Sequence, residues 1–144
     1  GDLPAAIGVD IDHPDVQPLI PNALEAGLDA LRTRGHYPIN HTIVVRDELL
    51  QARPDLARDV FDAFAEAKRI YLRNLRSGAI AKPTKVDEVH RRVMQITGDP
   101  LPYGIEPNRK VLQELVDSAR EQGIITRPAT IESLFPPGSE RLTG

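Results

Sequence analysis

The sequence contains no cysteine, and this absence excludes disulfide bonds, thiolate chemistry and cysteine-based zinc sites. It fits a cytoplasmic location, which we take as the expectation. No apolar run approaches the roughly 18 residues that a membrane-spanning helix needs, and no signal peptide is visible, so we expect no membrane contact. The formal net charge of −3 argues against a protein that binds nucleic acid through a basic surface.

Several signatures of common catalytic sites are also missing. There is no glycine-rich phosphate loop, no dinucleotide fingerprint, no Gly-x-Ser-x-Gly turn and no His-Glu-x-x-His pair, so kinase, hydrolase and zinc-protease functions have no support. The 144 residues, 40% apolar and 27% charged, are typical of a single folded domain or a large fragment of one. Because the chain begins at Gly1 and its one methionine is Met94, we expect it to be a piece of a longer protein.

Helices dominate the predicted structure. The strongest pattern follows Pro54, where apolar residues recur every three or four positions as far as Leu75 and Ser77-Gly78 ends the helix. Further helices are predicted at about 22–34, 84–97 and 108–122, with short helical turns at 47–52 and 131–135. Gly35 is the expected stop of the first helix and Thr84 the expected start of the third. The residues from Pro136 onward are expected to fray.

Two short apolar runs predict strands. Ile43, Val44 and Val45 have stiff, branched side chains that suit a buried strand, which we place at about 40–46. Residues Ala5–Val9 form a second candidate. The predicted fold class is therefore helix-rich α/β, with four or five helices and one or two short strands. Since a short strand is not stable alone, the rest of the sheet would lie outside this sequence.

The candidate site lies where the predicted strand begins. His41 is the candidate catalytic group, because an imidazole can give or take a proton near pH 7. Asn40 can hold an anionic oxygen through its amide, and Arg46 can bind a carboxylate through its planar guanidinium. His36 and Tyr37, in the preceding loop, can line the same substrate cleft.

Each of these residues also has a structural interpretation, which the sequence leaves open. His41 can be a structural histidine at the start of a buried strand, and Tyr37 can pack its ring on the core with its hydroxyl in water. Arg46 can be a solvated side chain that pairs with the acidic residues after it. Elsewhere, His90 is best explained as part of a solvated helix face, and Asn108 as a helix cap.

A weak candidate metal site lies near the beginning of the chain. Carboxylates and an imidazole suit a divalent ion, and Asp10, Asp12 and His13 supply them. Their spacing matches no strong motif, and aspartates next to proline are common in turns for backbone reasons. The cofactor is therefore left unassigned: the sequence requires none, and a divalent metal at these residues is the minor alternative.

Five motifs between residues 35 and 135 carry a family resemblance. They are Tyr37 to Val45, the helix start Pro54-Asp55-Leu56-Ala57-Arg58, the segment Pro102 to Arg109, the helix end Glu121-Gln122-Gly123, and Glu132-Ser133-Leu134-Phe135. Together they resemble the 4,5-dihydroxyphthalate decarboxylases, which are similar to type II periplasmic substrate-binding proteins with two α/β lobes around a ligand cleft. The resemblance implies that this chain is the C-terminal portion of such a fold. Residues 1–34 would be a remnant of the second lobe and a helix, 35–135 the hinge return strand and C-terminal helices, and 136–144 a tail.

The resemblance implies a carboxy-lyase that acts on a hydroxylated aromatic dicarboxylic acid in phthalate degradation, with a small aromatic carboxylate as its partner. In this hypothesis His41 is the acid and base, Arg46 clamps a carboxylate, and the neighbouring Asn40 and Tyr37 orient the substrate. None of these roles is inherited from the family. The alternative is a non-catalytic solute-binding protein of the ABC-transporter type. We expect the isolated chain to be inactive, because half a cleft does not exclude water, and to form a homo-oligomer through its unpaired apolar faces.

Overall fold

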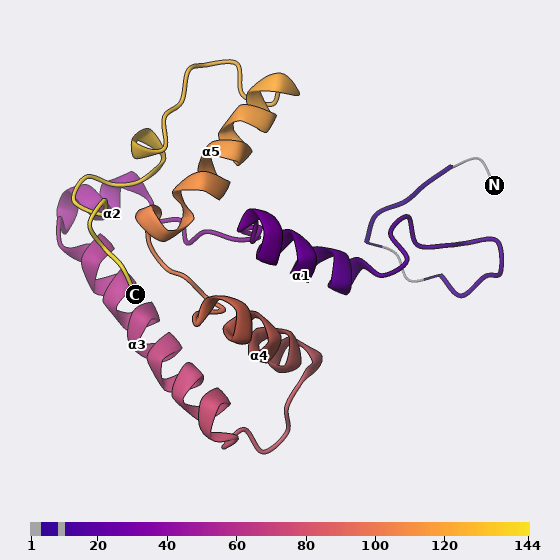
Figure 1. The fold of residues 1–144 in the computed structure, drawn as a ribbon. Helices are drawn as coiled ribbons and strands as arrows, with labels where there is room; N and C mark the ends of the chain where they lie inside the picture. Colours follow the sequence, from indigo (N-terminus) through magenta and orange to yellow (C-terminus); the bar gives the residue numbers. More distant parts are fainter. Residues whose placement is uncertain (1–3, 9–10) are drawn as a thin grey trace.

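The computed structural model describes residues 4–8 and 11–144, and helices make up its regular structure (Figure 1). The elements in chain order are α1 (Ala23–Arg34), α2 (Asp47–Ala52), α3 (Leu56–Ser77), α4 (Lys85–Thr97), α5 (Ile105–Glu121) and the short 3-10 helix η1 (Glu132–Leu134). None of the residues described forms a β-strand, so the predicted α/β class, with part of a two-lobed sheet fold, is wrong for this chain. No helix within the described ranges is long and apolar enough to cross a membrane.

The predicted strand at 40–46 is an irregular connection that leads to α2. Ile43 and Val44, which were expected to be buried, are 61% and 87% exposed. The described part of the chain contains no strand that could pair with this segment. An extended segment without a partner cannot join a hydrogen-bonded sheet, so no neighbouring strand covers these side chains. The other expected strand, Ala5–Val9, ends outside the described residues, and residues 5–8 are not a strand.

α3 and α4 lie side by side as a helical hairpin joined by residues 78–84 (Figure 1). Gly78 ends α3 at the predicted position, in the left-handed conformation with φ of 71°, and its N–H donates to the Asn74 carbonyl. Thr84 opens α4 as predicted. Its hydroxyl oxygen accepts from the N–H of Asp87, whose carboxylate accepts from the N–H of Thr84. This reciprocal pair satisfies two donors that a helix start would otherwise leave unpaired.

Two small apolar clusters hold the helices together. The first joins α1 to α4 through Leu28, Leu31 and Val93, with Tyr37, Val89 and Ile96 packed against it. The second joins α5 to the region of η1 through Ile105, Leu112 and Ile131, with Ile39 and Phe135 packed against it. Gly35 ends α1 in the left-handed conformation, as its position predicts.

α5 begins three residues before the predicted start, at Ile105. Asn108 therefore lies inside the helix and does not cap it, which corrects the sequence interpretation. Its Nδ2 donates to the carbonyls of Pro102 and Gly104, both at 2.8 Å, so it holds the loop that leads into the helix.

The C-terminal residues pack back onto this loop, and the expectation of a frayed tail is wrong. Tyr103 and Gly144 exchange backbone hydrogen bonds of 3.2 and 3.3 Å. Leu142 is buried. The end of the chain consequently lies between α3 and the loop before α5 (Figure 1).

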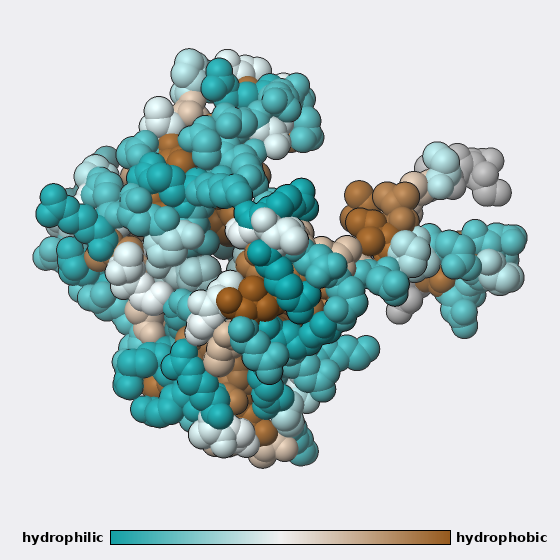
Figure 2. Space-filling view, viewed as in Figure 1, coloured by the Kyte–Doolittle hydropathy of each residue, from teal (hydrophilic) through white to brown (hydrophobic). Residues whose placement is uncertain are grey.

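Large apolar side chains remain exposed on the N-terminal segment. Ile7 and Leu19 are almost fully exposed, and Figure 2 shows apolar groups on the segment that projects away from the helices. Such surface commonly mediates association.

We expect the chain to self-associate, because Val44 and the N-terminal apolar residues have no partner in the described part of the chain. Sedimentation should give a mass that rises with protein concentration. Val44→Lys should shift the distribution toward the monomer, whereas Thr42→Lys, which adds the same charge at an exposed polar position, should not. A monomer at high concentration would contradict this expectation.

Candidate functional site

A connected polar cluster lies between α3 and α4. The hydroxyl of Tyr71 is 2.7 Å from Oδ1 of Asp87 and 2.8 Å from Nδ1 of His90. The other carboxylate oxygen of Asp87 accepts from the N–H and the hydroxyl of Thr84, both at 2.7 Å. The rings of Tyr71 and His90 meet edge to face, with centroids 5.7 Å apart. The hairpin thus holds a phenol, a carboxylate and an imidazole in one chain of hydrogen bonds.

The surroundings fix the protonation of each group in this cluster. Burial, reinforced by the hydrogen bond to Asp87, raises the pKa of Tyr71 to about 12. Hydrogen bonds from Thr84 and then Tyr71 lower the pKa of Asp87 to about 2, and burial lowers the pKa of His90. Because ionised Asp87 can only accept, the single hydroxyl proton of Tyr71 points to it. Nδ1–H of His90 must then donate to the Tyr71 oxygen, which leaves Nε2 of a neutral imidazole as the proton acceptor.

These pKa shifts predict that the free energy of unfolding is constant over a middle pH range and decreases at both lower and higher pH. Asp87 contributes fully above its unfolded value of 3.8, and its contribution is lost as the pH falls toward 2. His90 acts in the same direction below pH 6.5, because the unfolded chain takes up the proton more readily. Tyr71 contributes fully below pH 10 and loses its contribution as the pH rises toward 12. We expect the denaturation midpoint to be highest between pH 6.5 and 10.

Equilibrium unfolding by urea, followed by circular dichroism across the pH range, tests this profile. Tyr71→Phe should reduce the loss of stability at alkaline pH, and Asp87→Asn should reduce the loss of stability at acid pH. Asp62→Asn, an exposed site on α3, serves as the control and should leave the shape unchanged. An unaltered loss of stability at alkaline pH in Tyr71→Phe would show that the hydroxyl is not held as described.

A second polar centre lies one turn earlier on α3. Lys68 is only 6% exposed, and its Nζ donates to the carboxylate of Asp99 at 2.6 Å and to the carbonyl of Gly144. Nζ also lies 5.2 Å from the centroid of the Tyr103 ring. Burial, and after it the charge of Asp99, raises the pKa of Tyr37, which places Tyr37 near this centre. The centre therefore ties α3, the loop before α5 and the tail together.

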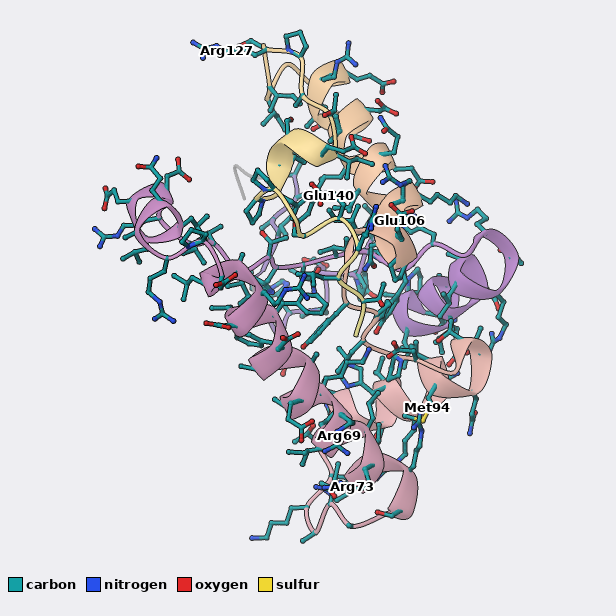
Figure 3. The ribbon with its side chains drawn as sticks, turned by 90° about the vertical axis from the view of Figure 1, so that its left-hand side faces the viewer. Arg69, Arg73, Met94, Glu106, Arg127 and Glu140 are labelled. Carbon is teal, nitrogen blue, oxygen red and sulfur yellow. The ribbon has the colours of Figure 1, made fainter. Side chains whose placement is uncertain are left out.

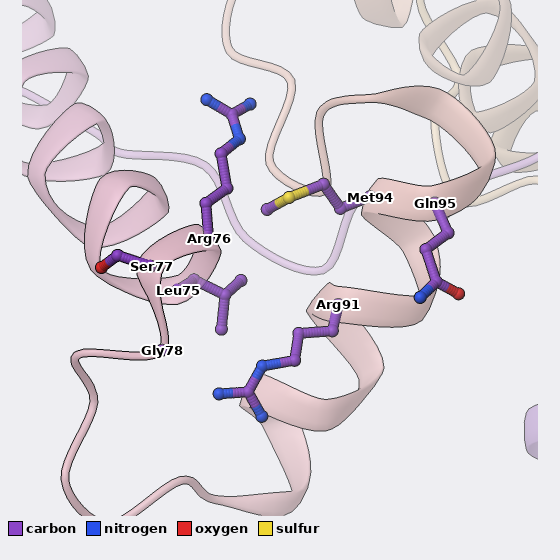
Figure 4. A pocket seen from close by; sticks show the side chains of 7 residues that line it. All are labelled: Leu75, Arg76, Ser77, Gly78, Arg91, Met94 and Gln95. Carbon is purple, nitrogen blue, oxygen red and sulfur yellow. The ribbon is translucent and has the colours of Figure 1, made fainter.

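An open pocket of about 570 Å³ lies between the C-terminal end of α3 and α4 (Figure 4). Its lining comprises Leu75, Arg76, Ser77 and Gly78 from the end of α3, and Arg91, Met94 and Gln95 from α4. Nη2 of Arg76 donates to the carbonyl of Gly98 at 3.2 Å. The charge of Arg91 acts to lower the pKa of both Tyr71 and Asp87, so the pocket adjoins the polar cluster.

The structure does not bring the five predicted site residues together. Nδ1 of His36 lies 2.9 Å from the carboxylate of Glu114 on α5. Tyr37 packs against the first apolar cluster, and of the five it is the one near the polar centres.

The remaining three predicted residues lie on the irregular connection before α2. Asn40 and His41 are exposed. Arg46 is 73% exposed and pairs with Glu48 at 3.5 Å, which agrees with its structural interpretation. The roles proposed for these side chains stay predictions.

The weak metal site is only partly described. Asp10 lies outside the described residues, and Nδ1 of His13 accepts from the N–H of Asp15 at 3.2 Å. Within the described ranges, no group of three or more potential ligands is arranged to hold a metal ion. The cofactor stays unassigned.

The cluster between α3 and α4 is not among the sites that the sequence predicts. Tyr71 falls within the apolar pattern of the helix after Pro54, and His90, which was expected on a solvated face, is half-buried and hydrogen-bonded. A partial signal was available: Asp87 follows Thr84 at capping-box spacing, and His90 follows Asp87 by three residues on the same helix face. The position of Tyr71 across the hairpin depends on packing, which no local pattern reveals.

Comparison with known proteins indicates a distant relationship. No protein-family model and no solved structure matches the chain. The chain is 27% identical over 133 residues to a 4,5-dihydroxyphthalate decarboxylase from Comamonas testosteroni, and the match covers 90% of this chain and 40% of that protein. The chain therefore spans about 40% of the length of the curated relative. That relative is named as a decarboxylase, and the match extends along almost all of this chain.

Proposed function

We propose that the protein is a carboxy-lyase that decarboxylates a hydroxylated aromatic dicarboxylic acid similar to 4,5-dihydroxyphthalate, in the catabolism of aromatic acids. The observation that carries the proposal is the match to a decarboxylase over 90% of the chain. The cysteine-free sequence fits a cytoplasmic location for this reaction, and cell fractionation is the test of that part.

The reaction sets clear requirements for the protein. A proton must reach the ring carbon that bears the carboxylate, the bond to the carboxylate then breaks, and its electron pair restores the aromatic ring as carbon dioxide leaves. A base that accepts the phenol proton assists this step, and cationic or amide groups hold the carboxylates. The net change is one proton taken up and one carbon dioxide released, so no oxidant or reductant is needed.

Two histidines are candidates for the proton transfer. His41 is the residue indicated by the sequence, and its exposed position leaves it accessible to a substrate. His90 has its tautomer fixed by Tyr71 and a lowered pKa, and the next residue on α4, Arg91, lines the pocket. The geometry favours His90 as the base that accepts the phenol proton, because its Nδ1–H donates to Tyr71 and its Nε2 is left free to accept a proton.

The test uses the full-length protein and 4,5-dihydroxyphthalate, with release of carbon dioxide as the readout. His90→Gln and His41→Gln should be compared side by side, since loss of the proton-transferring group should lower the rate on the order of 10²- to 10⁴-fold. Circular dichroism of each variant reports whether the fold is kept. A large loss with His41→Gln alone would return the role to the residue that the sequence indicates.

Other outcomes would overturn the proposal. Saturable binding of 4,5-dihydroxyphthalate without release of carbon dioxide would favour the alternative, a solute-binding protein that does not catalyse. Neither binding nor release would reject the substrate class and leave the relationship to the decarboxylase as one of sequence alone.

A further inference from the structure

We infer that Asp87 is a positioning residue for His90, on which it acts through the hydroxyl of Tyr71. In this arrangement Asp87 determines which nitrogen of the imidazole carries the proton, and it leaves Nε2 free to accept one. The assignment of the proton follows from the hydrogen bonds between α3 and α4. The use of Nε2 as the base for the phenol proton rests on the proposed function.

The carboxylate of Asp87 has different partners on its two oxygens. Oδ2 accepts from the N–H and the hydroxyl of Thr84, both at 2.7 Å, at the start of α4. Oδ1 lies 2.7 Å from the hydroxyl of Tyr71 on α3. Because a backbone N–H can only donate, the side of the carboxylate that faces Thr84 must present an acceptor. Oδ1 is therefore the oxygen that receives the Tyr71 proton.

The hydroxyl of Tyr71 passes this constraint on to His90. Its single proton points to Asp87, so its oxygen faces Nδ1 of His90, at 2.8 Å, as an acceptor, and Nδ1–H satisfies that contact. Within the described part of the chain, Nε2 has no hydrogen-bond partner, and no buried side-chain nitrogen or oxygen there lacks one. Nε2 is consequently open to solvent with a free lone pair.

The surrounding charges keep each group in the required state. Its hydrogen bonds lower the pKa of Asp87 to about 2, and the charge of Arg91 acts in the same direction. Burial, with Asp87 and Tyr37 acting in the same direction, raises the pKa of Tyr71 to about 12, so the phenol keeps its proton. Burial lowers the pKa of His90, and the charge of Asp87 opposes this effect.

The proton balance of the step is simple. Nε2 of His90 takes the phenol proton of the substrate, and the imidazolium that forms keeps its Nδ1–H on the Tyr71 oxygen. Tyr71 and Asp87 therefore do not change their own protonation. The negative charge of Asp87 favours the imidazolium without receiving a proton, which is the same division of roles as in a Ser-His-Asp triad.

Asp87→Asn should reverse the proton pattern while it keeps the size of the side chain. The N–H of Thr84 still requires an acceptor, so the amide oxygen takes the place of Oδ2 and the amide nitrogen faces Tyr71. The amide then donates to the Tyr71 oxygen, the hydroxyl proton turns to Nδ1 of His90, and the imidazole proton moves to Nε2. Nε2 becomes a donor and is lost as a base.

Long-range ¹H–¹⁵N spectra of histidine-labelled protein measure this tautomer directly. They should be recorded at about pH 8, above the ordinary imidazole pKa of 6.5, with the His90 signals assigned by their loss in His90→Gln. We expect a protonated Nδ1 in the natural protein and a protonated Nε2 in Asp87→Asn. Tyr71→Phe breaks the connection and should give a mixture of both tautomers. Glu88→Gln, which removes the same charge at the next, exposed position of α4, is the matched control and should keep the natural pattern.

The consequence for the reaction is measured with the full-length protein and 4,5-dihydroxyphthalate. Asp87→Asn should lower kcat for carbon dioxide release on the order of 10²- to 10⁴-fold, as expected for His90→Gln. KM should change little, because in this account Asp87 acts through Tyr71 and does not contact the substrate. Glu88→Gln should keep the natural rate, and amide spectra of each variant report the fold.

Several results would contradict the inference. These are a protonated Nε2 in the natural protein, an unchanged tautomer in Asp87→Asn, and the same reversal in Glu88→Gln, which would indicate a general charge effect. A reversed tautomer with unchanged kcat would remove Asp87 and His90 from the reaction. No carbon dioxide release from the unsubstituted full-length protein would reject the proposed function, and with it the role of Asp87 in the reaction, whereas the spectra decide the proton assignment independently.

Discussion

Replacing Gly104 by alanine is expected to destabilise the protein by about 3 kcal/mol or more and to release the C-terminal residues. Gly104 has φ of 107° and ψ of 167°, a region that essentially only glycine adopts. A Cβ at this position would also collide with the carbonyl oxygen of Leu142. Because the colliding oxygen belongs to the backbone, no side-chain rotation relieves the clash, and the tail must move.

Two terms make up the expected loss. The backbone conformation alone costs an alanine on the order of 1–3 kcal/mol. Displacement of the tail would expose Leu142, which is now buried, and burial of a leucine side chain contributes about 1.5–3 kcal/mol. The backbone hydrogen bonds between Tyr103 and Gly144 would be lost with it.

Urea unfolding of Gly104→Ala and Gly123→Ala separates these terms. Gly123 also has a positive φ, of 69°, but a Cβ there meets open space, so its substitution reports backbone strain alone. Removal of residues 141–144 should lower the cost of Gly104→Ala, since the collision then disappears. Equal costs for the two glycine substitutions in the full chain would contradict the tail packing.

The helix ends could be predicted from the sequence because their signals are local. Gly35 and Gly78 end α1 and α3 where a left-handed residue is needed, and the Thr84 hydroxyl caps α4 within the same short segment. Each signal depends on residues at most four positions apart, so no knowledge of the tertiary structure is required.

The strand prediction failed because a strand depends on partners far away in sequence. The run Ile43-Val44-Val45 has the right side chains, but within the described residues nothing pairs with it and its apolar surface stays exposed. The start of α5 failed for a different reason. The predicted range of 108–122 leaves Pro107 outside the helix, although proline is well tolerated in a first turn, where the missing N–H costs nothing.

The arrangement of the polar side chains depends on tertiary packing, which the sequence does not reveal. Tyr37 lies near the polar centres because α1 packs on α4, and its position before the predicted strand plays no part in this. His90 and Tyr71 interact across the α3–α4 hairpin, at a distance in sequence that a helical pattern does not connect.

The two polar centres share one face of α3. Lys68 and Tyr71 are three residues apart, and the buried Leu72 and Leu75 continue the same side of the helix. An apolar stripe alone would allow α3 to rotate or slide against α4. Hydrogen bonds from Lys68 and Tyr71 to specific acceptors fix one arrangement, which also sets the position of Arg76 at the pocket.

Lys68→Met is expected to destabilise the protein by about 1–3 kcal/mol. Methionine keeps most of the side-chain volume but leaves the carboxylate of Asp99 and the carbonyl of Gly144 without their donor. The loss should remain below the roughly 3–5 kcal/mol of a fully buried ion pair, because the Asp99 side chain is 38% exposed and water can replace part of the interaction.

A double-mutant cycle with Asp99→Asn tests this account. Since Asp99→Asn removes the charge that Lys68→Met leaves unpaired, the double variant should be more stable than the sum of the single losses predicts. Arg69→Met, at an exposed ion pair one residue further along α3, is the control and should leave stability unchanged (Figure 3). Additive losses in the cycle would mean that Lys68 stabilises α3 through its buried stem and not through Asp99, and the tail would then keep its position in the Asp99→Asn protein.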